Sequence, residues 1–207
     1  MSPHYDAVIF DLLSALLDSW SLWDDVAGDS TLGREWRIHY LEAASRTEHY
    51  EPYIPLISES ANAVGVAQSQ ANTLASRWSE LTPWPEATEI VAELASKTRI
   101  GVITNCSEEL GVEAADKIAI KFDVILTAER AGYYKPDPRI YKMAIKEIGE
   151  APERILYVAG SPYDVCGAAA VGMQVFWHNR TGLGDAEASP SATCSADTLN
   201  GIRNLIV

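Results

Sequence analysis

Polar groups of chemically useful types follow four apolar, strand-like segments of this 207-residue chain. In chain order these groups are Asp11, Thr104 with Asn105, Lys135, and Ser161 with Asp164. The carboxyl ends of parallel strands share one edge of a sheet, so groups far apart in the sequence can meet there. Asp11 ends the apolar segment that begins at Ala7, and an acid in that position is a candidate nucleophile.

Each of these groups, taken alone, has a plainer structural explanation. Asp11 could cap a following turn, and Thr104 could cap the next helix. Lys135 could be a solvated loop lysine, and Asp164 could cap a helix that begins near Val165. The complete set in chain order is more specific than any single member, which favours a shared site.

The elements that must position these groups alternate regularly after residue 86. The pattern predicts strands at 99–103, 122–127, 154–159 and 173–177, with helices at 86–96, 107–118, 139–149 and 165–171. Repeated strand, loop and helix predict an α/β protein with a mostly parallel, doubly wound sheet. The segment 182–196 is the one stretch with the composition of a flexible loop.

A run of helical patterns separates the first strand from the second. These patterns cover residues 34–49, 54–66 and 72–81, and a loop is predicted at 28–33. The run is too long for a single crossover connection and predicts an inserted helical lobe. We place this lobe at 16–83, with the return hinge at 83–85. The core then consists of residues 1–15 and 84–207.

The composition limits the partners of the protein. A net charge of -13 disfavours nucleic acid and anionic membrane surfaces as partners, because both would be repelled. An anionic substrate therefore needs a local basic pocket. No apolar run reaches the roughly 18 residues of a membrane span, and no cationic segment precedes a long apolar one at the start. We expect a cytoplasmic protein that binds neither nucleic acid nor membrane.

The cysteine and histidine residues predict neither a disulfide framework nor a zinc site. Any pairing leaves one of the three cysteines over, and none forms a C-x-x-C motif. The four histidines have no spacing suited to a metal. These residues are Cys106, Cys166 and Cys194, and His4, His39, His49 and His178.

With these motifs in this order, the chain resembles the haloacid dehalogenase superfamily over essentially its whole length. The matching segments are Val8-Ile-Phe-Asp11, Ile103-Thr-Asn105, Tyr134-Lys-Pro-Asp137 and Val158-Ala-Gly-Ser-Pro-Tyr-Asp164. The resemblance implies a Rossmann-like core with a helical cap inserted between the first two motifs. It also implies that Asp11 forms a covalent aspartyl intermediate. Thr104 would hydrogen-bond the substrate or the nucleophile, and Lys135 would keep Asp11 ionised.

Two positions favour one chemistry within that superfamily. Its magnesium phosphatases need an acid two residues after the nucleophile to protonate the leaving oxygen, and this chain has Leu13 there. They also carry an acid four positions before the last Asp to help hold Mg²⁺, and this chain has Gly160. Both differences favour the 2-haloacid dehalogenase branch, which uses no metal or other cofactor.

Further residues match that branch. Arg37, in Leu32-Gly-Arg-Glu-Trp-Arg37, matches the arginine that binds substrate and leaving halide, and Asn105 matches a second halide contact. Tyr141 and the segment Asn179-Arg-Thr-Gly182 match as well. The branch implies a small anionic 2-haloacid substrate, a 2-hydroxyacid product and a homodimer formed through the cap.

The same resemblance assigns roles to the remaining site residues. Asp164 with Ser161 would orient or deprotonate the hydrolytic water. Backbone N–H groups around Leu12 and Leu13 would hold the substrate carboxylate.

Three departures from the branch concern the surroundings of the nucleophile. Leu13 stands where the branch has an aromatic residue, Ser14-Ala15 where it has Gly-Thr, and Ala159 where it has Ser. Two alternatives therefore stay open. One is a magnesium-dependent phosphatase with a reduced metal site, and the other is a non-catalytic relative that only binds.

Overall fold

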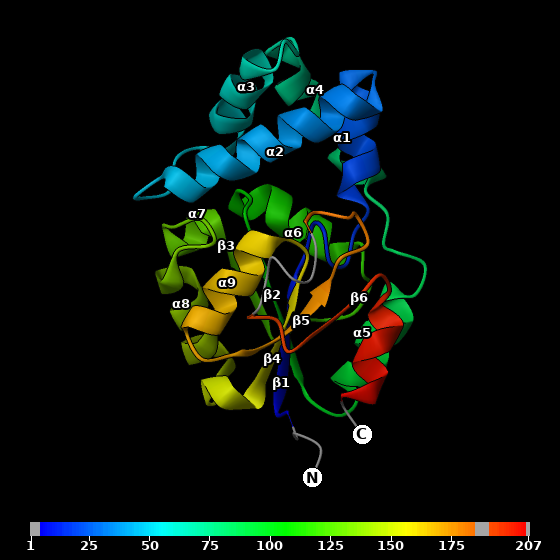
Figure 1. The fold of residues 1–207 in the computed structure, drawn as a ribbon, viewed down its shortest axis with the longest axis vertical. Coiled ribbons are helices and arrows are strands. Elements are labelled where there is room, and N and C mark those ends of the chain that lie inside the picture. The colour runs from blue at the N-terminus through cyan, green and yellow to red at the C-terminus, as the bar shows by residue number, and fades with distance from the viewer. Residues whose placement is uncertain (1–4, 185–190, 206–207) are drawn as a thin grey trace.

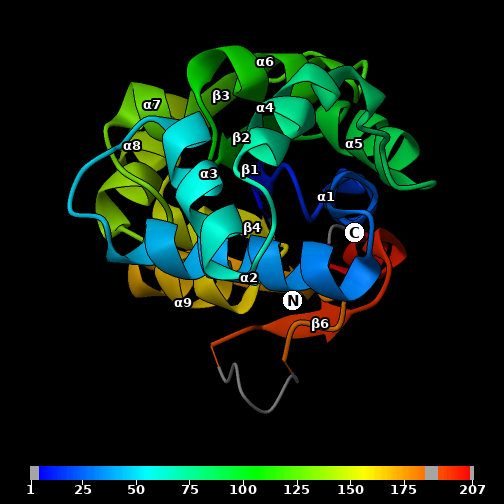
Figure 2. The same cartoon turned by 90° about the horizontal axis from the view of Figure 1, so that it is seen from above.

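The protein consists of a parallel sheet covered by helices and a group of four helices above one edge of that sheet (Figure 1). The computed structural model describes residues 5–184 and 191–205. Seen from above, the upper helices lie over the carboxyl ends of the central strands (Figure 2). This arrangement agrees with the predicted α/β core and inserted helical lobe.

The sheet has six strands in the order β3-β2-β1-β4-β5-β6, and all neighbouring strands are parallel. The strands are β1 (Ala7–Asp11), β2 (Arg99–Thr104), β3 (Val124–Thr127), β4 (Ile155–Ala159), β5 (Gln174–His178) and β6 (Cys194–Ala196). β1 lies in the middle, between β2 and β4, and all its residues are buried. A doubly wound parallel sheet is confirmed.

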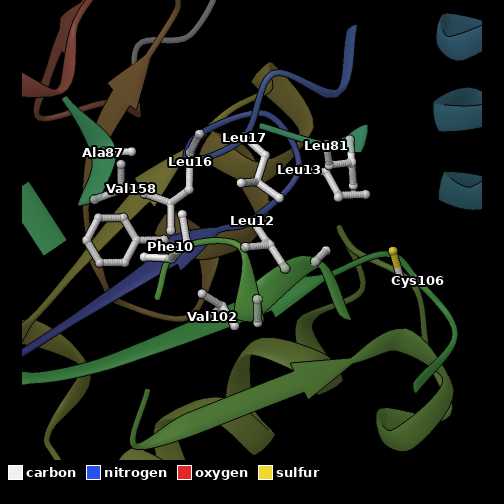
Figure 3. Close-up of a cluster of buried hydrophobic side chains, with 14 of the residues drawn as sticks. Phe10, Leu12, Leu13, Leu16, Leu17, Leu81, Ala87, Val102, Cys106 and Val158 are labelled. Carbon is white, nitrogen blue, oxygen red and sulfur yellow. The ribbon is translucent and has the colours of Figure 1, made fainter. Parts of the chain in front are cut away.

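Helices cover both faces of the sheet, and the residues of β1 alternate between two apolar clusters. Val8 and Phe10 belong to the cluster on the side of α5 (Ala87–Ala95), whereas Ala7 and Ile9 belong to the cluster on the side of α8 (Pro138–Ile148). Figure 3 shows Phe10 packed with residues of neighbouring strands and of α5. The core helices are α5 (Ala87–Ala95), α6 (Glu108–Asp116), α7 (Ala128–Ala131), α8 (Pro138–Ile148) and α9 (Pro162–Ala170), with short 3₁₀ helices at Pro152–Arg154 and Leu199–Asn204.

The helical lobe differs from the prediction at its beginning. It contains α1 (Ser19–Ala27), α2 (Ser30–Arg46), α3 (Tyr53–Ala63), α4 (Ser69–Ser76) and a 3₁₀ helix at Trp78–Glu80. No helix was predicted where α1 lies, and the loop predicted at 28–33 is confined to residues 28–29. Gly28 ends α1 with a φ of 78°, and the Asp29 side chain caps α2 by accepting from Thr31 N and Leu32 N, each at 2.9 Å. Gly33 lies within α2, and a Cβ there would collide with Asp24 Cα, so a glycine at this position is what lets α2 pack closely on α1.

Two antiparallel segments connect the lobe to the core. Leu17 forms an isolated bridge with Pro83, Asp18 N donates to Thr82 O at 2.9 Å, and Trp84 N donates to Leu16 O at 2.9 Å. The outgoing and returning chain therefore lie side by side close to Asp11.

Two further differences concern the ends of elements. β6 lies within the predicted flexible stretch 182–196, of which residues 185–190 fall outside the described part. α9 begins at Pro162 rather than Val165, so that Ser161 is its N-cap. Among the described residues, no helix has the length and apolar character needed to cross a membrane.

Candidate active site

Asp11 lies at the end of β1, where the chain turns into a tight loop of residues 12–17. The backbone N–H groups of Ser14 and Ala15 donate to Asp11 Oδ2 at 2.9 and 3.1 Å. Leu12 anchors this loop, because its carbonyl accepts from Leu16 N at 3.2 Å and its side chain is buried in the core (Figure 3). The loop therefore holds one oxygen of Asp11 between two amides.

Lys135 holds the other oxygen. Its Nζ lies 2.6 Å from Asp11 Oδ1 and 3.1 Å from Asp164 Oδ1, and the lysine is only 4% exposed. Burial favours the neutral amine, but the two carboxylates outweigh it and raise the pKa of Lys135 above its usual value. Lys135 therefore stays charged and holds both acids in one site.

Asp164 lies in the first turn of α9 and is 4% exposed. Ser161 caps this turn, since its Oγ accepts from Asp164 N at 3.3 Å. The Tyr141 hydroxyl donates to Asp164 Oδ1 at 3.1 Å and reaches it across Gly167, where a Cβ would lie 2.6 Å from the tyrosine ring. Burial raises the pKa of Asp164 above its usual value, although Lys135 opposes that shift. A carboxyl in this environment can accept a proton more readily than an exposed one.

Arg37 lies on α2, is 3% exposed, and lines the cavity beside Asp11. One of its guanidinium nitrogens donates to Ser14 Oγ at 3.0 Å and another to Ser19 Oγ, and the group lies 4.1 Å from the centre of the Trp20 ring. None of the ion pairs among the described residues involves Arg37. Burial lowers its pKa from the usual value. A buried cation with only neutral partners is an attractive site for a small anion.

Asn105 connects the end of β2 to the lysine loop, which is the segment 132–137 that carries Lys135. Its Oδ1 accepts from Lys135 N at 2.7 Å, and its Nδ2 donates to Lys135 O at 3.1 Å. The Tyr40 hydroxyl of α2 donates to the Asn105 carbonyl at 2.7 Å, so the helical lobe contacts the core here. An amide nitrogen carries two hydrogens, so Asn105 retains a second donor for a ligand.

These groups surround a cavity of about 30 Å³ between α2 and the sheet. A cavity needs about 10–15 Å³ to hold one water, so this space suits a very small ligand. The cavity is lined by Asp11, Leu13, Ser14, Arg37, Tyr40, Leu41, Asn105, Lys135, Ser161, Tyr163 and Asp164. The structure thus brings together seven of the ten predicted site residues.

The other three predicted residues do not line this cavity. Thr104 is fully buried and donates to Cys106 Sγ at 3.6 Å, and its hydrogen bond to the substrate or to Asp11 stays a prediction. Tyr141 is fully buried, lies outside the cavity lining and donates to Asp164 Oδ1, so substrate binding by this residue stays a prediction. The Leu12 side chain belongs to the core, and substrate binding by backbone N–H groups around Leu12 and Leu13 stays a prediction.

The structure also adds residues to the predicted set. Ser14 and Ser19 hold Arg37, and Trp84 Nε1 donates to Ser14 O at 2.9 Å. His178 is buried at the end of β5, and its Nδ1 lies 2.9 Å from Ala15 O. The replacement of Gly-Thr by Ser14-Ala15 was a sequence signal for Ser14, but no sequence motif marked the others.

The absence of a side chain at Gly160 leaves room for the Asp11 carboxylate and the loop that follows it. A Cβ at this position would lie 2.5 Å from Asp11 Oδ2 and 2.7 Å from Ala15 N, closer than real Cβ contacts. An acid at residue 160 cannot be accommodated in this arrangement. The described part of the chain also contains no group of three or more His, Cys, Asp or Glu residues suited to a metal ion.

The fold and the site together define a class of α/β enzyme with a strand-end aspartate, a lysine that bridges it to a second aspartate, and a cavity closed by inserted helices. Residues 8–178 match the family model of haloacid dehalogenase-like hydrolases. The chain belongs to this family, and it is an enzyme, a hydrolase similar to haloacid dehalogenases.

Full-length relatives and a solved structure agree with this family. The chain is 27% identical over 218 residues to haloacetate dehalogenase H-2 of Moraxella sp. (strain B), and 97% of each protein is covered. It is 30% identical over 193 residues to (S)-2-haloacid dehalogenase 4A of Burkholderia cepacia, with 85% of this chain and 84% of that protein covered. A dehalogenase solved as an intermediate complex has a TM-score of 0.84 and 26% identity, and the match covers 100% of this chain and 99% of that one.

Proposed function

We propose that this protein hydrolyses short 2-haloacids to 2-hydroxyacids and halide, through an ester on Asp11 and without a metal ion. The observation that carries this proposal is the position of Arg37. Its buried guanidinium lines the same small cavity as Asp11 and binds only neutral groups in the described part of the chain. A small organic anion with an electrophilic carbon fits this pairing of cation and nucleophile.

In the first half of the reaction, Asp11 attacks C2 of the substrate. The bond between Asp11 oxygen and C2 forms as the carbon–halogen bond breaks, and halide leaves with the bonding electrons. Oδ2 is crowded by two amides and by Gly160, so we assign the attack to Oδ1. Arg37 and the free N–H of Asn105 stabilise the halide, and the N–H groups around Leu12 and Leu13 hold the substrate carboxylate.

In the second half, water attacks the carboxyl carbon of the Asp11 ester. Asp164 takes the proton of the water, and Ser161 helps to orient it. Negative charge develops on Oδ2, which already lies between the N–H groups of Ser14 and Ala15. The bond between the carboxyl carbon and Oδ1 then breaks, and the hydroxyacid leaves with Oδ1 and the proton from Asp164. The second proton of the water dissociates from the Asp11 carboxyl group, which returns to its carboxylate form.

Metal independence is supported by two residues. Leu13 lines the cavity where a phosphatase of this superfamily needs an acid to protonate the leaving oxygen. Gly160 replaces the metal-binding acid and leaves no room for one. Both residues disfavour the magnesium phosphatase alternative.

Cytoplasmic location and a homodimer are also part of the proposal. The location rests on composition, and the homodimer through the helices of residues 16–83 rests on the family resemblance. Sedimentation equilibrium tests the dimer directly.

The test of the activity is halide and hydroxyacid release from short 2-haloacids in EDTA, beside a phosphate-ester assay with Mg²⁺. Asp11→Asn should abolish halide release. Asp137→Asn, which removes an acid of the same lysine loop that lies outside the cavity, is the matched control. A single turnover in H₂¹⁸O should leave one ¹⁸O in the carboxyl group of Asp11, because water attacks that carbon.

Two results would contradict the proposal. Phosphate release that depends on Mg²⁺, without halide release, would mean that the site recruits a metal despite Gly160. A protein silent in both assays, with Asp11→Asn binding haloacids as the wild type does, would indicate a relative that only binds.

A further inference from the structure

Both peptide groups that donate to Asp11 Oδ2 are themselves held at their carbonyl oxygens. The Leu13–Ser14 peptide donates through Ser14 N at 2.9 Å, and its carbonyl accepts from the Ser19 hydroxyl. The Ser14–Ala15 peptide donates through Ala15 N at 3.1 Å, and its carbonyl accepts from Trp84 Nε1 at 2.9 Å. Each peptide therefore forms a hydrogen bond at both of its ends.

Such chains of hydrogen bonds have a chemical consequence. A donor at the carbonyl fixes the peptide plane and polarises the group, so its N–H becomes a stronger donor. Ser19 belongs to α1, and Trp84 belongs to the returning segment that pairs with Leu16. The donors come from the inserted lobe and its hinge, not from the sheet that carries Asp11.

We propose that Trp84 is a positioning residue for hydrolysis of the Asp11 ester, and that Ser19 acts in the same way on the neighbouring peptide. This inference rests on the proposed dehalogenation. When water attacks the ester carbon, the electron pair of the carbonyl bond moves to Oδ2. The Trp84 indole N–H orients and polarises the peptide whose N–H meets that developing charge.

The two halves of the reaction depend differently on this peptide. Formation of the ester removes negative charge from Asp11, so stronger N–H donors give this step no advantage. Hydrolysis restores negative charge on Oδ2, and the same donors then lower the barrier. Loss of the Trp84 hydrogen bond should therefore slow hydrolysis and leave ester formation almost unchanged.

The chain offers a matched pair of variants. Trp84→Phe removes the indole N–H but keeps an aromatic ring against Arg180, whose guanidinium lies 4.8 Å from the Trp84 ring centre. Trp78→Phe is the control, because Trp78 Nε1 also donates to a backbone carbonyl of the core, Leu110 O at 2.8 Å, away from the Asp11 loop.

The first measurement combines steady-state kinetics with mass spectrometry of the enzyme during turnover. For Trp84→Phe we expect kcat to fall roughly five- to tenfold, less than the loss of a whole oxyanion donor, while kcat/KM stays within about twofold. The Asp11 ester should accumulate. A parallel fall of kcat and kcat/KM without ester, or the same change in Trp78→Phe, would overturn the proposal.

The second measurement needs no substrate, which separates this inference from the proposed function. Loss of the Trp84 donor should shift the ¹H and ¹⁵N amide resonances of Ala15 and the ¹³C resonance of the Asp11 carboxyl. Trp78→Phe should leave both unchanged. If the wild type releases no halide, the proposed function has failed, and unchanged Ala15 and Asp11 resonances in Trp84→Phe would show that the positioning role has failed too.

Discussion

Gly160 lies so close to Asp11 that no side chain fits between them. A Cβ on Gly160 would lie 2.5 Å from Asp11 Oδ2, and the same atom would meet Ala15 N at 2.7 Å. The glycine therefore leaves the space that the Asp11 loop needs to wrap its two amides around Oδ2. A metal-binding acid at residue 160 and this arrangement of the loop exclude each other.

Gly160→Ala should disrupt the site. The new methyl group forces the Asp11 loop to move, so we expect halide release to fall by tenfold or more and stability to drop by about 1–3 kcal/mol. Halide assays and thermal unfolding measure both effects. Gly101→Ala is the control, because its Cβ would lie no closer than 3.3 Å to a neighbour, Val124 O. Full activity in Gly160→Ala would show that the loop has room to shift without consequence.

Arg37→Met should separate activity from stability. Arg37 is a buried cation without a carboxylate partner in the described residues, so on the proposed function its removal should weaken binding of the anionic substrate while it relieves a desolvation cost. We expect KM for the haloacid to rise more than tenfold, while the unliganded protein unfolds at an equal or higher temperature. Bromide should stabilise the wild type against heat but not the variant.

The control for Arg37 is its neighbour on the same helix. Arg34 lies 5.5 Å from the Trp20 ring centre and donates to Thr181 O at 3.0 Å, outside the cavity. Arg34→Lys should keep the bromide effect and the KM of the wild type. Equal losses in both variants would assign the arginines a structural role.

The pH dependence of hydrolysis should follow Asp164 and Lys135. Burial raises the pKa of Asp164, so the base is lost at a higher pH than for an ordinary aspartate as the solution is acidified. The pKa of Lys135 is raised against the effect of burial by Asp11 and Asp164, so the cation survives to high pH. We expect kcat to fall on the acid side with an apparent pKa above that of a free aspartate, and a plateau through pH 7–9.

The directions of these two pKa shifts also determine how Asp164 and Lys135 make the free energy of unfolding depend on pH. Asp164 has a raised folded-state pKa, so its contribution is greatest below its unfolded value and is lost as pH rises through the folded value. Lys135 also has a raised pKa in the folded state, so its contribution to stability is fully present below its unfolded pKa and is lost only at strongly alkaline pH. Asp164→Asn should remove the acidic dependence, which unfolding measured between pH 3 and 7 will detect.

The sequence was sufficient to predict the strand ends, because two features show where a strand ends. One is the end of an apolar run, and the other is the polar residue that follows it. Buried strands such as β1 are continuous apolar runs, and the polar residue that ends each run lies at the shared edge of a parallel sheet. Asp11 and Thr104 end β1 and β2, and this rule predicts that they lie at the same edge. Lys135 lies eight residues beyond the end of β3, so its contact with Asp11 was predicted from its place in the ordered set of motifs. Arg37 was found only through the family resemblance, since a helix arginine carries no such mark.

Contacts that depend on how the lobe docks were not predictable. Trp84 and Ser19 reach the Asp11 loop only because the outgoing and returning segments pair, and their spacing shows no pattern. A loop was predicted at 28–33 because Gly28, Asp29 and Gly33 are residues typical of loops. Gly28 in fact ends one helix, Asp29 caps the next, and Gly33 permits the two helices to cross closely.

Tyr141→Phe should test whether this residue binds substrate or positions Asp164. The hydroxyl donates to Asp164 Oδ1 at 3.1 Å and lies outside the cavity lining, so its loss should affect the base and not the substrate. We expect kcat to fall by roughly two- to fivefold with KM unchanged, and the acidic apparent pKa of kcat to rise, because a hydrogen bond to the carboxylate favours its charged form. The control is Tyr157→Phe, whose hydroxyl is 3.3 Å from Lys135 Nζ. Tyr157→Phe should leave the acidic apparent pKa of kcat unchanged. A rise in KM that occurs in Tyr141→Phe and not in Tyr157→Phe would show that Tyr141 binds the substrate.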